Sequence, residues 1–265
     1  MKTYYFMSGL PRSGSSLLSA IFNQNPNFYC GPSSPSMSLM LSLEKDFNTN
    51  ELYHAYPKEN FKKKLIASAL YQYYDDVGKP IIVDKNRSWT HRLEYIEKYF
   101  DIAEPKVICT VRSLDEILTS FITMIHRSKR ISFIDKALME HKVPINDFHR
   151  CQYIAADGPL GRAYTGLGTA FKNGFGKNIH LVEYTDLVNN PKTTMDKIYE
   201  FLGEETYEHD FTDLKNVHQE NDEKVYGLAD MHSVRQEINS ISKDPKDVLP
   251  QKVLDDVKGL EFWKT

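Results

Sequence analysis

The stretch Thr3–Leu18, TYYFMSGLPRSGSSLL, decides the fold. Its first part, Thr3–Met7, is a short aromatic-rich run that predicts a buried strand. A Gly/Ser/Pro loop follows, and Ser16–Asn23 then places its apolar residues on one face of a predicted helix. A strand, a glycine-rich loop and a helix in this order predict an anion site. The reason is that backbone N–H groups converge at the helix N-terminus and the helix dipole favours negative charge.

The loop also supplies side chains suited to phosphate or sulfate oxygens. Ser13, Ser15 and Ser16 offer hydroxyl groups, and Arg12 offers a planar guanidinium. The spacing imitates the phosphate loop of nucleoside triphosphate enzymes, but Ser15 stands where that loop has its lysine. The alternative interpretation is a tight turn that binds nothing.

Strands and helices alternate along the rest of the chain. Further strands are predicted at Pro80–Val83, Lys106–Val111 and Asn178–Tyr184. Helices are predicted at 61–74, 90–100, 113–128, 160–172, 192–202 and 251–257, and Cys30–Ser38 is expected to be an irregular loop. This order predicts the α/β class, with a mainly parallel sheet flanked by helices in a single domain over residues 1–265.

A second anion site is expected where the strand Lys106–Val111 ends. Arg112 follows the strand directly, and Ser120 lies about two turns along the predicted helix. Ligands bind at the carboxyl ends of parallel strands, so this site would adjoin the first. Arg112 also stands where a triphosphate enzyme would place a magnesium-binding carboxylate. The two sites suit a nucleotide phosphorylated at two separated positions, although an ion pair with Glu116 would explain Arg112 without a ligand.

Composition disfavours several other classes of protein. The chain has 265 residues, of which 41% are hydrophobic and 26% charged, as is typical of a globular protein. Its net charge of −3 disfavours a general nucleic-acid binder. The three cysteines give no disulfide framework, His and Cys do not gather at zinc-ligand spacing, and no apolar stretch suits a signal peptide or membrane span. We expect a cytoplasmic protein without metal, nucleic-acid or membrane partners; the sequence leaves its oligomeric state open.

Three segments resemble the sulfotransferases that use 3′-phosphoadenosine 5′-phosphosulfate (PAPS). Gly9–Leu18 (GLPRSGSSLL) resembles their 5′-phosphosulfate loop, notably that of tyrosylprotein and bacterial glycan-type members. Val111–Ser120 (VRSLDEILTS) resembles their 3′-phosphate segment, and Val182–Gly203 (VEYTDLVNNPKTTMDKIYEFLG) is similar to a third stretch. The resemblance implies one α/β domain related to nucleotide kinases. It also implies sulfuryl transfer, without a metal, to a hydroxyl of a sugar, tyrosine or small molecule, with 3′-phosphoadenosine 5′-phosphate (PAP) as product.

The same resemblance implies roles for individual residues. Those that would bind the nucleotide are Pro11, Arg12, Ser13, Gly14, Ser15 and Ser16 around the phosphosulfate, Arg112 and Ser120 at the 3′-phosphate, Tyr184, and Arg235 on a late basic loop. Arg12 and Lys85 would be the catalytic cations, with Lys85 stabilising charge on the bridging oxygen. Alternatively, Tyr184 is an aromatic cap on the sheet, Lys85 a solvated loop residue, and Asp222–Arg235 a surface helix.

The general base is missing from the place where the resemblance implies it. Related members often carry a glutamate in the segment beyond the loop, whereas Gly31–Ser36 holds no carboxylate. We take Asp84 as the first substitute because it adjoins Lys85 at a strand end, with His91, His218 and His232 as others. Two further functions stay open: a phosphate-loop kinase of a nucleotide or small metabolite, and a non-catalytic nucleotide-binding module. Acceptor specificity is expected in loops at 30–60 and 131–161.

Overall fold

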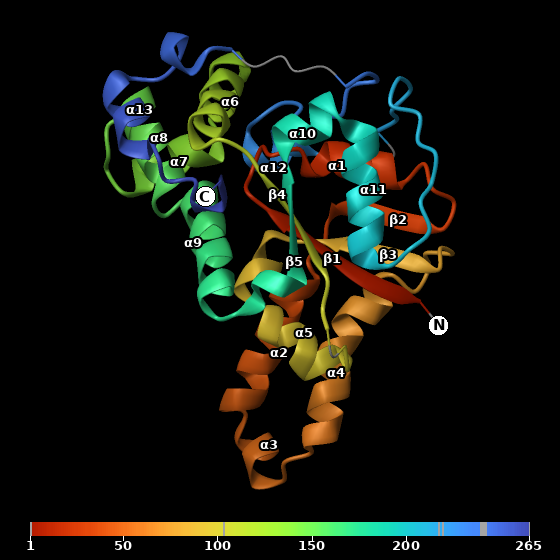
Figure 1. Ribbon diagram of the computed structural model, residues 1–265. Helices are drawn as coiled ribbons and strands as arrows, with labels where there is room; N and C mark the ends of the chain where they lie inside the picture. Colours follow the sequence, from red (N-terminus) through yellow and green to blue (C-terminus); the bar gives the residue numbers. More distant parts are fainter. Residues whose placement is uncertain (1, 103, 217, 219, 239–242, 265) are drawn as a thin grey trace.

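The structure is a computed structural model that describes residues 2–102, 104–216, 218, 220–238 and 243–264 (Figure 1). Its centre is a five-stranded parallel sheet with the strand order β2-β3-β1-β4-β5. The strands are β1 Thr3–Gly9, β2 Phe28–Ser33, β3 Ile81–Lys85, β4 Val107–Val111 and β5 Ile179–Glu183. The predicted α/β class with a mainly parallel sheet is confirmed. No helix in the described ranges is both long and apolar enough to cross a membrane.

Helices cover both faces of the sheet, and successive strand residues face different helices. On one face α1 (Ser15–Phe22) and α11 (Pro191–Leu202) pack against Met7 and Val83. On the other face Phe6 and Ile82 contribute to the larger core. The remaining α-helices are α2 Ser36–Thr49, α3 Glu51–Ala55, α4 Glu59–Tyr73, α5 Leu93–Phe100, α6 Leu114–Arg127, α7 Phe133–Glu140, α8 Asp147–Ala155, α9 Pro159–Lys172, α10 Tyr184–Asn189, α12 Asp222–Tyr226 and α13 Gln251–Val257.

The prediction of an irregular loop at Cys30–Ser38 is wrong. Strand β2 occupies its first half and α2 begins at Ser36. Because β2 is the edge strand and pairs with β3 alone, it tolerates Pro32 and a register shift between Cys30 and Ser33. The glycine and proline in this edge strand therefore predict a loop, although the backbone of β2 pairs with β3.

The segments expected to be variable loops, 30–60 and 131–161, are largely helical. They contain α2, α3, α7 and α8. Three of these helices begin at a side chain that accepts a hydrogen bond from a backbone N–H, and these caps are Asn50, Ser132 and Asn146. In Figure 1, α2, α3 and α4 extend away from the sheet as an arm with α3 at its tip.

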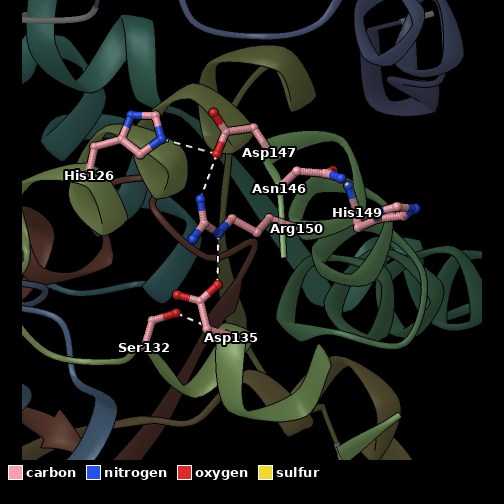
Figure 2. A network of polar contacts seen from close by, with 7 residues as sticks. All are labelled: His126, Ser132, Asp135, Asn146, Asp147, His149 and Arg150. Atoms are coloured by element: carbon pink, nitrogen blue, oxygen red, sulfur yellow. Dashed lines mark hydrogen bonds and ion pairs between the residues drawn. The ribbon is translucent and has the colours of Figure 1, made fainter. Parts of the chain in front are cut away.

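A charged network ties α7 and α8 to the last turn of α6 (Figure 2). Arg150 donates from Nε to Asp135 Oδ1 at 2.7 Å and from Nη1 to Asp147 Oδ1 at 2.8 Å. His126 Nε2 lies 3.0 Å from the same oxygen of Asp147. The side chains of Arg150 and Asp135 are only 15% and 10% exposed, so these bonds are largely shielded from water and hold the three helices in one arrangement.

The carboxyl ends of the parallel strands meet at one edge of the sheet. The register places Met7 of β1 beside Lys85 at the end of β3, and Gly9 beside Thr110 of β4. Arg112 comes directly after β4, and Tyr184 directly after β5. The fold thus gathers the residues predicted from four separate strand ends at the edge where ligands bind in such sheets.

Candidate active site

The loop Leu10–Gly14 turns over the end of β1 and leads into α1. Gly9 (φ 145°) and Gly14 (φ 96°) adopt conformations that favour glycine. A Cβ on Gly9 would lie 2.3 Å from Thr110 Oγ1, and one on Gly14 would lie 2.9 Å from the Tyr184 ring. Both positions therefore need glycine. The first N–H groups of α1, which have no partner within the helix, are brought to the strand-end edge.

A cavity of about 440 Å³ lies beside this loop, within the range of small-molecule sites. We call it the cationic cavity, because it is lined by six cationic side chains and two acidic ones: Arg12, Arg87, Arg112, Arg127, Arg235 and Lys243, and Asp230 and Glu237. Its formal excess of four positive charges favours a multiply charged anion.

The predicted loop residues divide between this cavity and the interior. Arg12, Gly14, Ser15 and Ser16 line the cationic cavity. Ser13 is fully buried, and its hydroxyl lies 2.7 Å from Thr110 Oγ1 and 3.0 Å from the Thr110 carbonyl oxygen. Its side chain therefore fastens the loop to β4 and is turned away from the cavity. Pro11 is also buried and is not among the lining residues.

Arg12 is held in a costly conformation at the centre of the site. Its φ of 60° is left-handed, which is unfavourable for a residue with a side chain. Its guanidinium donates to Ser120 Oγ at 3.1 Å and to the carbonyl of Met231. Burial, and then the nearby Arg112 and Arg87, lower the pKa of Arg12 to about 10. It still carries its charge at neutral pH, and an anion in the cavity would offset the repulsion among these cations.

Arg112 both braces the loop and lines the cationic cavity. It is 8% exposed, and it donates to Glu116 Oε2 at 3.0 Å and to the Arg12 carbonyl at 3.1 Å. Its guanidinium carbon lies 4.2 Å from the centre of the Tyr184 ring, a cation–π contact. The ion pair between Arg112 and Glu116, which was the alternative to a ligand, is therefore present. Arg112 nevertheless also lines the cavity. Tyr184 likewise packs in the site and lines it.

The late segment, from Asp222 to Lys243, lines the cationic cavity in its later part. Only Asp222–Tyr226 is helical, as α12, so the surface-helix alternative holds for that part alone. Residues from Asp230 to Ile238, with Arg235 among them, then line the cationic cavity. The Met231 carbonyl that accepts from Arg12 fastens this segment to the phosphate loop.

Three cations of this cavity were not predicted from the sequence. Arg87 lies two residues beyond Lys85, the last residue of β3. This position near a strand end was the only feature of the sequence that could have indicated a place in the site. Arg127 follows Ser120 by two helical turns, so spacing along α6 places both on one face. Lys243 lies far along the chain from every predicted motif, and nothing in its surroundings marks it.

Asp84 and Lys85 lie on opposite faces of the sheet, because side chains alternate along β3. The buried Asp84 carboxylate accepts hydrogen bonds from Trp89 Nε1 at 2.6 Å, Tyr74 OH at 2.8 Å and Ser36 Oγ at 3.3 Å. Burial raises the pKa of Asp84. The structure therefore does not bring this carboxylate to the face of Lys85, and Asp84 is not among the residues that line either cavity.

Lys85 faces a second cavity, on the side of the sheet covered by α1. This second cavity has a volume of about 20 Å³, and its lining includes Ser16, Lys85, His218, Glu220 and His232. Lys85 is 6% exposed, and burial lowers its pKa. The solvated-loop alternative is thus wrong for Lys85, because the ammonium lies in the interior. His91 lies elsewhere, with Nε2 against the carbonyl of Arg162.

His232 lines both cavities and is oriented by two carboxylates. Its Nδ1 lies 2.6 Å from Asp222 Oδ1 and 3.3 Å from Glu220 Oε2. A carboxylate only accepts hydrogen bonds, so Nδ1 carries the proton and Nε2 of the neutral ring is the proton acceptor. Burial lowers the pKa of His232 against the opposing effect of the two carboxylates. Ligand atoms of these three residues lie within 4.8 Å of one another, so the same group could also bind a metal ion.

Comparison with known proteins identifies the family. The sequence matches the model of the sulfotransferase family over residues 5–209. Among proteins with curated descriptions, none matches it. The solved sulfotransferase domain from the curacin biosynthetic pathway is 14% identical, with 98% of this chain and 92% of that chain covered and a TM-score of 0.53.

Two other solved structures are similar at lower TM-scores. The sulfotransferase domain of the Synechococcus PCC 7002 olefin synthase is 15% identical, with 97% of this chain and 94% of that chain covered and a TM-score of 0.48. A mouse sulfotransferase, SULT7A1, complexed with PAP, is 10% identical, with 78% and 59% covered and a TM-score of 0.46. At such identities a structure shows a shared fold alone, whereas the family model spans most of the chain, from β1 to beyond α11. The chain therefore belongs to the sulfotransferase family.

Proposed function

We propose that this protein transfers the sulfuryl group of PAPS to an acceptor hydroxyl. The observation that carries the proposal is the cationic cavity, with its excess of four positive charges at the strand-end edge. PAPS carries about four negative charges at neutral pH, of which its 3′-phosphate contributes nearly two. Membership of the sulfotransferase family supports the choice of this donor.

The two ends of the donor would bind at different strand ends. The phosphosulfate lies at the N-terminus of α1, where Ser15, Ser16 and Arg12 line the cavity. The 3′-phosphate lies against α6, where Ser120 and Arg127 share a face and Arg112 comes from the end of β4. Arg235 supplies charge from the late segment.

Catalysis in this proposal depends on positioning and charge stabilisation. Sulfuryl transfer forms a bond from the acceptor oxygen to sulfur and breaks the bond from sulfur to the 5′-phosphate oxygen, which keeps the electron pair. Lys85, shielded from water and lining the second cavity next to the shared Ser16 and His232, stabilises the charge that grows on that oxygen. Arg12 binds the group being transferred.

His232 is the general base of the proposal. Its Nε2 takes the proton of the acceptor hydroxyl, while Asp222 fixes the tautomer and stabilises the imidazolium that forms. The lowered pKa keeps the ring neutral near pH 7. A base at this position removes the main support for the non-catalytic alternative. If the same three residues held a metal ion that the reaction needs, a chelator would abolish turnover; the proposal expects turnover to be unchanged.

Calorimetry tests the donor site directly. We expect PAP to bind without metal and far more tightly than adenosine 5′-phosphate, which lacks the 3′-phosphate that Arg112, Ser120 and Arg127 would bind. ATP with Mg²⁺ is the control for the kinase alternative. Equal affinity for PAP and adenosine 5′-phosphate would remove the 3′ site, and tight binding of ATP only with Mg²⁺ would favour a kinase.

A further inference from the structure

The second cavity has room for one small group. Its volume of about 20 Å³ is close to that needed by a single water molecule. It is enclosed by α1, the end of β2, Lys85 of β3 and the segment that leads into α12. It shares Ser16 and His232 with the cationic cavity, so a group placed there lies next to the phosphosulfate end of the proposed donor.

The lining of this second cavity is almost entirely polar. Eight of its side chains carry groups that can donate or accept hydrogen bonds: Ser16, Ser19, Asn23, Lys85, Asn216, His218, Glu220 and His232. Among the described residues, Ala20, Gly31 and Pro32 complete the lining, which there contains no aromatic ring apart from the two histidines. Such a surface favours hydroxyl groups over an apolar ring.

Two of these side chains have polar atoms without a protein partner among the described residues. In the described part of the chain, the ammonium of Lys85 has no hydrogen bond or ion pair, although the residue is 6% exposed. Among the same residues, Nε2 of His218 is buried and unbonded, while its ring packs against Tyr29 with centroids 5.4 Å apart. Buried polar groups are normally hydrogen-bonded, so this pair points to a ligand with hydroxyl oxygens, which both donate and accept.

We propose that the second cavity binds the hydroxymethyl group of a polyhydroxylated acceptor, a sugar or polyol, and that its primary hydroxyl receives the sulfuryl group. This inference rests on the proposed function and adds the class of acceptor. The volume admits a hydroxyl on a slender CH₂ group but not a phenol ring. The remaining hydroxyls would lie at the mouth, where Asn216 is exposed and Glu220 is half-buried.

The geometry of the cavity brings the reacting groups together. The hydroxymethyl oxygen forms the new bond to sulfur, and its proton passes to Nε2 of His232. The bond between sulfur and the 5′-phosphate oxygen breaks, and that oxygen leaves as PAP with the electron pair. Lys85 lines the same cavity as the hydroxymethyl group, and His218 donates or accepts at the acceptor oxygen without taking part in the bond changes.

Matched acceptors test the proposal. The probes are methyl β-D-glucopyranoside, its 6-deoxy analogue, which lacks only the primary hydroxyl, and phenol. Release of PAP from PAPS is measured with each, and binding of each to the complex of the protein with PAP is measured by ligand-observed NMR. We expect binding and turnover of the glucoside, and a loss of at least tenfold in kcat/KM with both the 6-deoxy analogue and phenol. Equal turnover of the 6-deoxy analogue, or preference for phenol, would overturn the proposal.

A variant pair separates the acceptor site from the donor site. His218→Phe keeps the ring against Tyr29 and removes the nitrogen, so we expect the KM for the glucoside to rise about tenfold, as for one lost hydrogen bond. The affinity for PAP should stay unchanged. Asn60→Leu, on the exposed side of α4, is the control and should change neither quantity. An unchanged KM in His218→Phe contradicts the assignment.

The two proposals fail in different ways. If PAP does not bind and no acceptor releases it from PAPS, the proposed function is wrong. If PAP binds, but the complex with PAP does not bind the glucoside and no sulfuryl group is transferred to it, the acceptor class alone is wrong.

Discussion

At the residue scale, the end of β3 shows how strand alternation assigns two neighbours to different tasks. Asp84 accepts three hydrogen bonds on the side of the larger core, and Lys85 points to the side of α1. The sequence analysis grouped the two because they are adjacent, although a period of two in a strand already separates them. Two residues that are adjacent in a strand therefore point to opposite faces of the sheet and are not expected to share a site.

We predict that Asp84→Asn destabilises the fold by about 1–3 kcal/mol, because an amide NH₂ would face the donors that the carboxylate now accepts. Urea unfolding of the variant and of Asp75→Asn, an exposed control, measures the difference. Turnover of the folded Asp84→Asn protein should be close to that of the wild type. Intact stability with abolished turnover would restore Asp84 as the base.

We predict that Lys85→Ala slows transfer about a hundredfold while the affinity for PAP stays nearly unchanged. Charge on the bridging oxygen is small in the ground state and grows as the bond breaks, so a cation there lowers the barrier without tightening binding. A factor of a hundred corresponds to about 2.7 kcal/mol. Single-turnover rates and calorimetry measure the two quantities, with Lys64→Ala on the exposed side of α4 as control. Wild-type turnover in Lys85→Ala would refute the assignment.

At the element scale, the β4–α6 junction was largely predictable and the late segment was not. The continuous apolar run of β4, the Arg112 that follows it and the spacing to Ser120 all indicate a strand end that leads into a helix. By contrast, His232 meets Asp222 because the chain turns back at Gly227 (φ 68°) after one short helix. No periodicity in the sequence encodes that contact, so the base that we propose, His232, was only one of several candidate histidines.

We predict that Arg112→Ala weakens binding of PAP by about 1.5–3 kcal/mol, the range for a hydrogen bond to a charged group. The loss should be smaller with adenosine 5′-phosphate, which has no 3′-phosphate and is affected only indirectly, through lost bracing contacts such as that from Arg112 to the Arg12 carbonyl. Calorimetry with both nucleotides, and with the exposed Arg92→Ala as control, gives the comparison. The same loss with both nucleotides would show that Arg112 acts only as a brace.

The late segment gives a pH-dependent prediction. Burial lowers the pKa of His232 below the ordinary histidine value of 6.5, so the ring takes up its proton only in solution more acidic than for a free histidine. We expect kcat/KM to reach a plateau towards neutral pH and to fall in acid, with a midpoint below pH 6.5. Asp222→Asn should lower the plateau at least tenfold, because the amide no longer fixes the Nδ1–H tautomer. A profile that falls only above pH 6.5 would exclude a histidine base.

At the scale of the whole molecule, the cationic cavity is assembled from both ends of the chain. Arg12 belongs to the first loop, whereas Arg235 and Lys243 come from the late segment, and the Met231 carbonyl joins the two through Arg12. Prediction from sequence could find the parts that lie at strand ends, since parallel topology brings those together. In the late segment it found Arg235 through the family resemblance but not Lys243, which no motif marks.

This arrangement predicts that PAP stabilises the molecule as one unit. A single domain over residues 1–265 should unfold in one thermal transition, and PAP at a hundred times its Kd should add about 2.7 kcal/mol of stability, which raises Tm by about 5–10 °C. Because the cavity holds an excess of four positive charges, the increment should shrink as salt rises from about 0.1 M to about 1 M, where the Debye length falls from about 10 Å to about 3 Å.

Scanning calorimetry at both salt concentrations, each with and without PAP, isolates the increment from the effect of salt on the free protein. Adenosine 5′-phosphate at the same concentration is the matched ligand and should raise Tm much less. Two separate transitions would contradict the single domain, and an increment independent of salt would contradict binding by charge in this cavity.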